Sequence, residues 1–128
     1  MAAEHRGTSS DLLILITNLV STVAQKAQRQ KPLAQKRTDQ RYPLNLAVGV
    51  SCHAPAGEFR AEYYAWGLDL SYQGIGLLME RQLEPQTLLY LLLKVTSLGN
   101  LVFPARVVSC RHLAGNIHRV GAAFVFDP

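Results

Sequence analysis

The spacing of apolar residues changes its period once along the chain, near residue 43. On the N-terminal side, Leu12, Ile16, Leu19 and Val23 follow one another at intervals of four, three and four residues, the spacing of one face of an α-helix. Serine and aspartate residues that favour a helix start precede this stretch, and basic residues that favour a helix end close it. The pattern predicts one amphipathic helix over about residues 11–30, which packs either on its own domain or on a second copy in a homo-oligomer.

From residue 44 onward the apolar period becomes two, which is typical of half-buried strands. Turns rich in Gly, Asn and Pro separate the apolar runs, and a length of 128 residues suits one domain. We therefore predict a mainly β fold, a six-stranded antiparallel β-barrel preceded by one amphipathic N-terminal helix, because closure into a barrel removes exposed strand edges. The predicted strands cover residues 44–52, 60–71, 75–80, 85–95, 100–113 and 118–126.

Two of these strands carry apolar residues that need a specific environment. In the second strand, strict alternation places the large residues Tyr64 and Trp66 on the inward face. The fourth strand is apolar on both faces, so its outer face, formed by Leu88, Tyr90 and Leu92, requires a cover. We expect the N-terminal helix to supply that cover, from the same chain or from a second copy.

Positive charge is concentrated in the segment between the helix and the first strand. The chain has 13 basic and 9 acidic residues, a net charge of +4, and six of the basic residues fall between positions 26 and 41, where Asp39 is the only acid. Pro32 and Pro43 bracket this segment and disfavour a continuous helix through it. Such a local excess of charge favours a local anionic ligand. The predicted parts of the chain are an N-terminal tail and helix (1–30), a basic arm (31–43) and a barrel (44–128).

Other features of the sequence exclude several function classes. The longest apolar run, residues 12–24, falls short of the ~20 residues that span a membrane. The polar N-terminus lacks the pattern of a secretory signal, so we expect a cytoplasmic protein. The four histidines and two cysteines show neither metal-ligand spacing nor a nucleophile beside a base, so we expect no enzyme, no metal and no cofactor.

Two short motifs carry the candidate chemistry. The arginine motif, Arg37 and Arg41, offers two donor forks that suit phosphate oxygens and the guanine edge, although a solvated basic linker would look the same. The aspartate motif, Asp69, Ser71 and Gly74, follows in the second strand, where Asp69 and Ser71 stand two residues apart. These two side chains could address one ligand together, or they could tie down the following turn.

The arginine motif, R-x-x-x-R, followed about thirty residues later by D-x-S-x-x-G in a six-stranded chain, resembles the PilZ domain family. The resemblance covers about residues 35–126, and the segment "VGAAF" is similar to the last strand of that family. It implies a six-stranded β-barrel that binds the bacterial second messenger cyclic di-GMP and performs no chemistry on it. The expected role is that of a receptor whose basic arm becomes ordered around the ligand.

The resemblance also implies a role for each motif residue. Arg37 and Arg41 would contact phosphate and the O6/N7 edge of guanine, and Asp69 would accept hydrogen bonds from N1 and N2 of guanine. Ser71 would bond nearby polar groups of the ligand or the arm, and Gly74 would admit the backbone turn.

One further residue and the partners stay open at this point. Lys36 occupies a position where the family varies between one ligand molecule and an intercalated pair, so it is a sixth candidate ligand-binding residue, and the stoichiometry is open. The signal would pass to an unidentified protein partner or to a covalently attached effector domain. The alternatives are a barrel that binds single-stranded nucleic acid, and a PilZ-like protein-interaction module without ligand.

Overall fold

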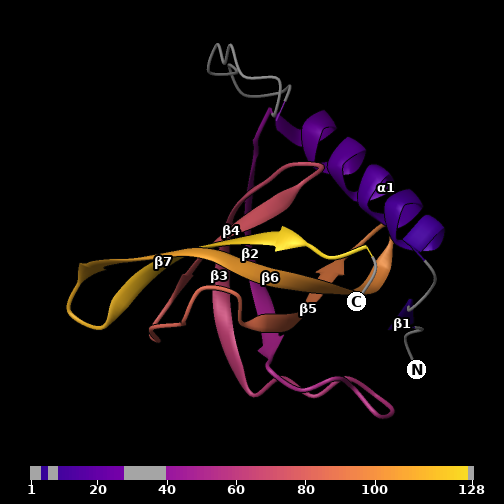
Figure 1. The fold of residues 1–128 in the computed structure, drawn as a ribbon. Coiled ribbons are helices and arrows are strands. Elements are labelled where there is room, and N and C mark those ends of the chain that lie inside the picture. The colour runs from indigo at the N-terminus through magenta and orange to yellow at the C-terminus, as the bar shows by residue number, and fades with distance from the viewer. Residues whose placement is uncertain (1–3, 6–8, 28–39, 127–128) are drawn as a thin grey trace.

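A computed structural model describes residues 4–5, 9–27 and 40–126 of the chain (Figure 1). The predicted helix and all six predicted strands are present, and a two-residue strand that we did not predict precedes the helix. The helix begins at Ser9, two residues before the predicted start. The elements are β1 (Glu4–His5), α1 (Ser9–Ala27), β2 (Tyr42–Ser51), β3 (Tyr63–Leu70), β4 (Gly74–Met79), β5 (Leu88–Val95), β6 (Gly99–Ala114) and β7 (Ile117–Phe124).

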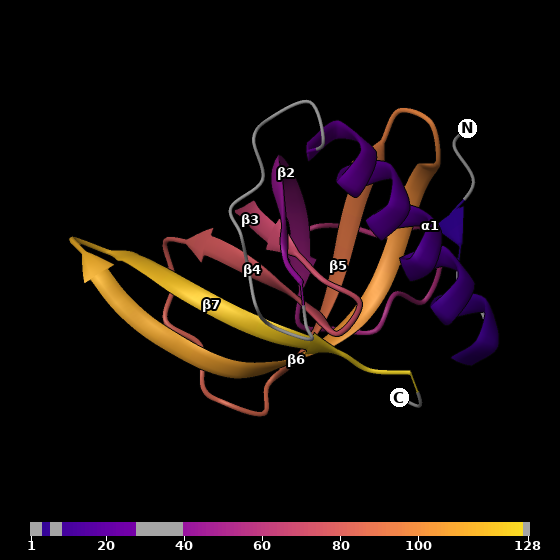
Figure 2. The same cartoon turned by 90° about the horizontal axis from the view of Figure 1, so that it is seen from above.

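The strands form one antiparallel barrel, as the sequence predicts. Their order is β6-β5-β2-β3-β4-β7, and β7 pairs again with β6, which closes the barrel. β6 makes closure possible because it is 16 residues long, so that its first half pairs with β5 and its second half with β7. The short β1 adds to the edge of β6 in parallel. Both views show that the β6–β7 hairpin extends away from the rest of the barrel (Figures 1 and 2).

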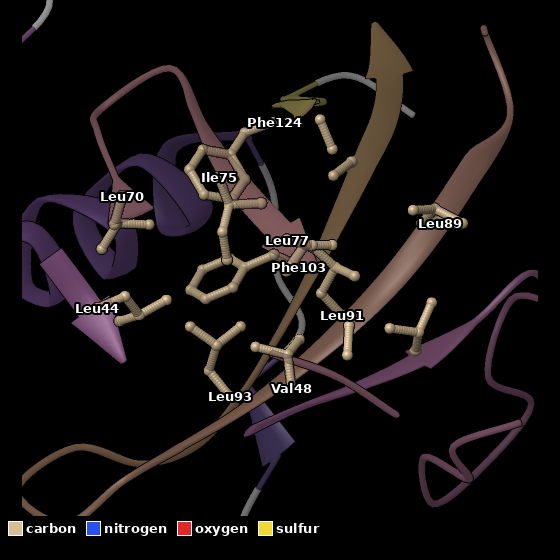
Figure 3. Packing of buried hydrophobic residues seen from close by; sticks show 14 of the residues in the cluster. Leu44, Val48, Leu70, Ile75, Leu77, Leu89, Leu91, Leu93, Phe103 and Phe124 are labelled. Carbon is tan, nitrogen blue, oxygen red and sulfur yellow. The ribbon is translucent and has the colours of Figure 1, made fainter. Parts of the chain in front are cut away.

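The core fills the barrel and continues into the helix. Leucine side chains of β4 and β5 meet Phe103 of β6 and Phe124 of β7 inside the barrel, with the two phenylalanine ring centroids 5.7 Å apart (Figure 3). The helix lies across one side of the barrel (Figure 2). Its buried residues belong to the same cluster as the inward strand residues, which confirms the predicted apolar stripe. The buried helix residues, 0–7% exposed, are Leu12, Ile16, Leu19, Val20 and Val23.

The helix of the same chain does not cover the outer face of β5, so that part of the expectation is wrong, and cover from a second copy stays a prediction. The helix residues pack in the cluster that holds the inward residues of β5, whereas Leu88, Tyr90 and Leu92 lie outside this cluster. Phe59, in the loop between β2 and β3, is 7% exposed and lies against this outer face instead. A Cβ atom built on Gly49 would be 3.3 Å from the Phe59 ring and 3.4 Å from Cβ of Leu92. The loop therefore provides part of the cover that we assigned to the helix.

The predicted alternation in β3 is also wrong, because a β-bulge interrupts the strand. Tyr64 and Trp66 point outward, with 72% and 45% of their surface exposed, whereas Ala65 and Gly67 are buried. Between Gly67 and Asp69 the register with β4 shifts by one residue. A bulge reverses the alternation beyond it, so Asp69 lies on the same outer face as Trp66.

Candidate ligand-binding site

The candidate site lies on the outside of the barrel, where the end of β3 meets β4 and β7. Asp69 pairs with Gly76 of β4, and Gly76 pairs with Gly121 of β7, which in turn lies opposite Ser109 of β6. Two neighbouring strands thus carry no side chain in this row. The result is a strip of bare backbone with a carboxylate at one end and a hydroxyl at the other.

Asp69 is held by two arginines, one on each carboxylate oxygen. Nη1 of Arg41 donates to Oδ1 at 2.9 Å, and Nη2 of Arg119 donates to Oδ2 at 3.1 Å. The Asp69 side chain is 20% exposed, against 29% for Arg41 and 46% for Arg119. The carboxylate is therefore largely withdrawn from water, and two charge-assisted hydrogen bonds compensate for that loss.

Glycine is required at two positions around Asp69. A Cβ on Gly76 would lie 2.6 Å from Oδ1 of Asp69, so the bare backbone of β4 is what allows the carboxylate to lie down on the sheet. A Cβ on Gly74 would collide with the carbonyl oxygen of Ala122 on β7. Gly74 thus permits the close pairing of β4 with β7, and Gly76 makes room for the side chain.

Ser71 lies in the turn that follows β3, and its side chain is fully buried. Its Oγ accepts hydrogen bonds from the backbone N–H groups of Gln73 at 3.1 Å and Gly74 at 3.2 Å. The backbone of Ser71 also donates to the carbonyl of Gly74 at 2.9 Å. Within the described residues, the hydroxyl thus bonds the turn while Asp69 bonds the two arginines, so the two side chains of the aspartate motif have different partners.

The structure brings together four of the six predicted site residues, which are Arg41, Asp69, Ser71 and Gly74. Arg41 directly precedes β2 and meets Asp69 although 28 residues separate them in the chain. Lys36 and Arg37 lie outside the described residues. Their predicted roles stay predictions.

Two residues of the site were missed by the sequence analysis, Arg119 and Gly76. Neither belongs to a motif, and Arg119 is 50 residues from Asp69 along the chain. The signal that could have located them is strand register, because Asp69, Gly76 and Gly121 occupy one row across β3, β4 and β7. Arg119 stands two residues before Gly121 and therefore on the same face.

An aromatic surface adjoins the site on the outer face of the barrel. Trp66 pairs with Ala47 of β2 on one side and with Leu78 of β4 on the other, and Leu78 pairs with Arg119. Tyr64, 72% exposed, stands two residues before Trp66 on the same face. On the β2 side the rings stand beside the small residues Ala47 and Gly49, and on the β4 side Leu78 separates Trp66 from Arg119.

A second polar cluster lies at the opposite end of β3, in the loop between β2 and β3. Oε1 of Glu62 accepts hydrogen bonds from Oγ of Ser51 at 2.8 Å and from the backbone of Cys52 at 2.7 Å, and it lies 2.7 Å from Nδ1 of His53. The hydrogen bond to His53, followed by those to Ser51 and Cys52, lowers the pKa of Glu62 to about 2. The cluster shapes a loop that lines an open hollow of ≈ 490 Å³.

The described part of the chain, residues 4–5, 9–27 and 40–126, has neither a helix that could span a membrane nor a metal-binding cluster. No helix within it is both long and apolar enough to cross a bilayer. Nor does it bring three or more His, Cys, Asp or Glu side chains into an arrangement that could hold a metal ion.

Comparison with known proteins identifies a family and solved structures of similar fold. The family model described as PilZ domain matches residues 35–128. Among solved structures, the "Structure of K. pneumonia MrkH-c-di-GMP complex" is similar in fold, with 18% sequence identity and a TM-score of 0.51. The similarity covers 75% of this chain but 46% of the MrkH chain, so this chain corresponds to less than half of that protein. No curated protein matches the sequence.

Proposed function

Because the chain belongs to the PilZ domain family, we propose that it is a receptor domain for cyclic di-GMP. The fold is similar to that of MrkH, whose structure is a complex with this messenger, and that likeness supports the choice of ligand. The domain would bind the messenger and pass the signal to a partner protein or an attached module. We place this activity in the cytoplasm, where a bacterial second messenger would reach it.

The observation that carries the proposal is the ion pair between Arg41 and Asp69 at 2.9 Å. It joins one residue from the arginine motif to one from the aspartate motif, which supports a single site for both motifs on the barrel surface. Arginine binds phosphate or the O6/N7 edge of guanine through two parallel hydrogen bonds. An anionic ligand would therefore compete with Asp69 for Arg41, and the arm that ends at Arg41 would respond to the ligand.

Asp69 is the proposed guanine-recognising group. A carboxylate accepts hydrogen bonds and cannot contact phosphate favourably, whereas N1 and N2 of guanine are neighbouring donors. Gly76 beside it gives the carboxylate room to lie against β4, which would hold it in place for the base. Ser71 and Gly74 would act on this site through the turn that follows β3, because their contacts fix its backbone.

The proposal is tested by calorimetric titration of cyclic di-GMP into the wild type and into Arg37→Ala and Arg41→Ala. Loss of one hydrogen bond to a charged group costs about 1.5 to 3 kcal/mol, which is roughly a 10-fold to 150-fold loss of affinity. Arg60→Ala is the matched control, since Arg60 is exposed in the loop at the far end of β3. Wild-type affinity in both motif variants would show that the arm is a linker only.

The same titration gives the stoichiometry, which is the measurement that concerns Lys36. The molar ratio at the midpoint of the titration distinguishes one bound ligand molecule per chain from two. If two bind, Lys36→Ala should lower the ratio to one, because the basic residue would serve the second molecule.

The exposed rings of Tyr64 and Trp66 favour a second candidate function, the binding of single-stranded nucleic acid. Aromatic side chains on an open barrel face next to arginines can stack successive bases, with about 1 to 3 kcal/mol for each base. Titration of a labelled oligonucleotide at increasing salt tests this function, because such binding weakens steeply with salt. Tight, salt-sensitive oligonucleotide binding without binding of cyclic di-GMP would support this candidate, and binding of neither would favour a protein-interaction module.

A further inference from the structure

Arg119 lies outside both motifs, yet it bonds the same carboxylate as Arg41. The two arginines use different oxygens of Asp69, Oδ1 for Arg41 and Oδ2 for Arg119. Neither bond therefore blocks the other. A carboxylate has about four acceptor positions, so both arginines leave positions on Asp69 free for a further donor.

The two arginines come from elements of different kinds. Arg41 directly precedes β2, at the end of the arm. Arg119 is inside β7, where its backbone pairs with Leu78 of β4 on one side and with Arg111 of β6 on the other. Two neighbouring strands thus fix the position from which Arg119 reaches Asp69, whereas Arg41 stands just before its strand begins.

The position of Arg119 is costly for the barrel. Arg119 lies directly opposite Arg111 in an antiparallel pair, and like charges in that arrangement are destabilising. Asp69 neutralises Arg119, while Arg111 has no ion-pair partner among the residues that the structure describes. Stability of the hairpin therefore does not explain an arginine at position 119, but contact with Asp69 does.

In the proposed function, Arg41 leaves Asp69 when it binds the ligand. The side chain of Asp69 is only 20% exposed, so if Arg41 were its one cation, the departure of Arg41 would leave a largely buried carboxylate unpaired. That cost would oppose the exchange. Arg119 removes it, because Asp69 keeps one charge-assisted bond throughout.

We infer that Arg119 is a positioning residue for guanine recognition: it holds Asp69 through Oδ2 in the orientation that meets N1 and N2 of guanine, while Arg41 exchanges Asp69 for the ligand. This inference rests on the proposed function. It predicts that Arg119 affects which base is preferred, and that Arg111, although equally charged and adjacent, affects only general attraction of the anion.

The test compares Arg119→Gln with Arg111→Gln, which remove the same charge from directly opposite positions. Each variant is titrated with cyclic di-GMP and with its inosine counterpart, which lacks the 2-amino group. The wild type should prefer the guanine form by roughly 10-fold to 150-fold, the value of one hydrogen bond to a charged group. In Arg119→Gln the preference should fall toward unity, and in Arg111→Gln it should persist while both affinities fall by one common factor.

Conservative replacement and melting curves guard against a folding artefact. Arg119→Lys keeps the charge and should recover part of the preference for the guanine form, even if Arg119→Gln melts too early for titration. An unchanged preference in Arg119→Gln would overturn the inference, as would a gain in cyclic di-GMP affinity, which would identify Arg119 as a competitor of the ligand. Absence of cyclic di-GMP binding by the wild type would instead refute the proposed function itself.

Discussion

Replacement of Gly76 by alanine tests the geometry of the site with the smallest chemical change available. The new Cβ would lie 2.6 Å from Oδ1 of Asp69, where ordinary contacts begin at 3.4 Å, so that oxygen must retreat by about 0.8 Å. Its 2.9 Å bond from Arg41 would then exceed the 3.2 Å limit of a good N–H···O hydrogen bond. The backbone itself can accept alanine, because Gly76 has no positive φ.

The magnitude follows from the two effects of the substitution. A hydrogen bond to a charged group contributes about 1.5 to 3 kcal/mol, and the partial exposure of Arg41 reduces the expected loss to about 1 to 2 kcal/mol. Alanine also restricts the unfolded chain, which stabilises by about 0.4 to 1 kcal/mol and offsets part of the loss in unfolding experiments. Arg41 gives up its bond to Asp69 when the ligand binds, so affinity would fall because the displaced Asp69 carboxylate loses a charge-assisted hydrogen bond of similar size to guanine, and this loss carries no such offset. We therefore expect cyclic di-GMP to bind Gly76→Ala roughly 5 to 30 times more weakly, with little change in melting temperature.

Gly57→Ala is the matched control for this measurement. A Cβ at Gly57 would meet no atom within 4 Å, so this variant carries the backbone effect of alanine without a displaced side chain. Both variants are titrated with cyclic di-GMP and melted under the same conditions. Equal dissociation constants for Gly76→Ala and Gly57→Ala would refute the reasoning, because the placement of Asp69 against β4 would then be irrelevant to the ligand.

Three further predictions concern the helix, the loop and the carboxylate. Leu19→Ala should destabilise the protein by about 2 to 5 kcal/mol in urea unfolding, because Leu19 is fully buried, whereas Ile14→Ala, at a position 59% exposed, should change stability by about 0.5 kcal/mol or less; equal effects would show that the helix is not part of the core. The folded-state pKa of Glu62, about 2, lies below its usual value of 4.5, so the stabilising effect of ionised Glu62 is full above pH 4.5 and is lost as the pH falls toward 2. The stability difference between wild type and Glu62→Gln should accordingly be constant above that range and shrink within it, and a difference independent of pH would contradict the role of the His53 contact. Asp69→Asn should weaken the binding of cyclic di-GMP more than it weakens the binding of cyclic di-AMP. Equal losses of affinity for both ligands would assign Asp69 a purely structural role.

Much of the fold could be predicted from the sequence because the regular spacing of apolar residues in a long segment indicates its secondary structure and its buried face. The helix stripe and the six strands follow from burial of regularly spaced residues, and the structure confirms both. The cover of β5 could not be predicted in this way. Phe59 stands in a loop without periodicity, and its contact with the face of Gly49 and Leu92 depends on the path of that loop.

The candidate site divides along a similar line. Arg41 and Asp69 could be predicted because each belongs to a motif of fixed spacing, and the structure brings the two together. Arg119 could not, since its contact with Asp69 depends on the order of the strands, which places β4 between β3 and β7. Arg119 contacts Asp69 across β4 because its side chain is long and the barrel places the strands in this order. No local sequence pattern encodes that contact.

The bulge in β3 explains both the wrong placement of Trp66 and the position of Asp69 in the site. Strict alternation along β3 placed Trp66 inward, whereas Ala65 and Gly67 face the core and the strand then gains one residue at Leu68. Without that bulge, the alternation that buries Gly67 would also turn Asp69 into the core, where an ionised carboxylate is strongly disfavoured. β2 has its own irregularity between Pro43 and Leu46, opposite the bulge, so both strands change register where Asp69 emerges. The two adjacent irregularities carry Asp69 to the outer surface beside Trp66 and leave the following Leu70 fully buried. The bulge in β3 thus places Asp69 in the site. A prediction that assumes regular alternation cannot describe the strand at that position.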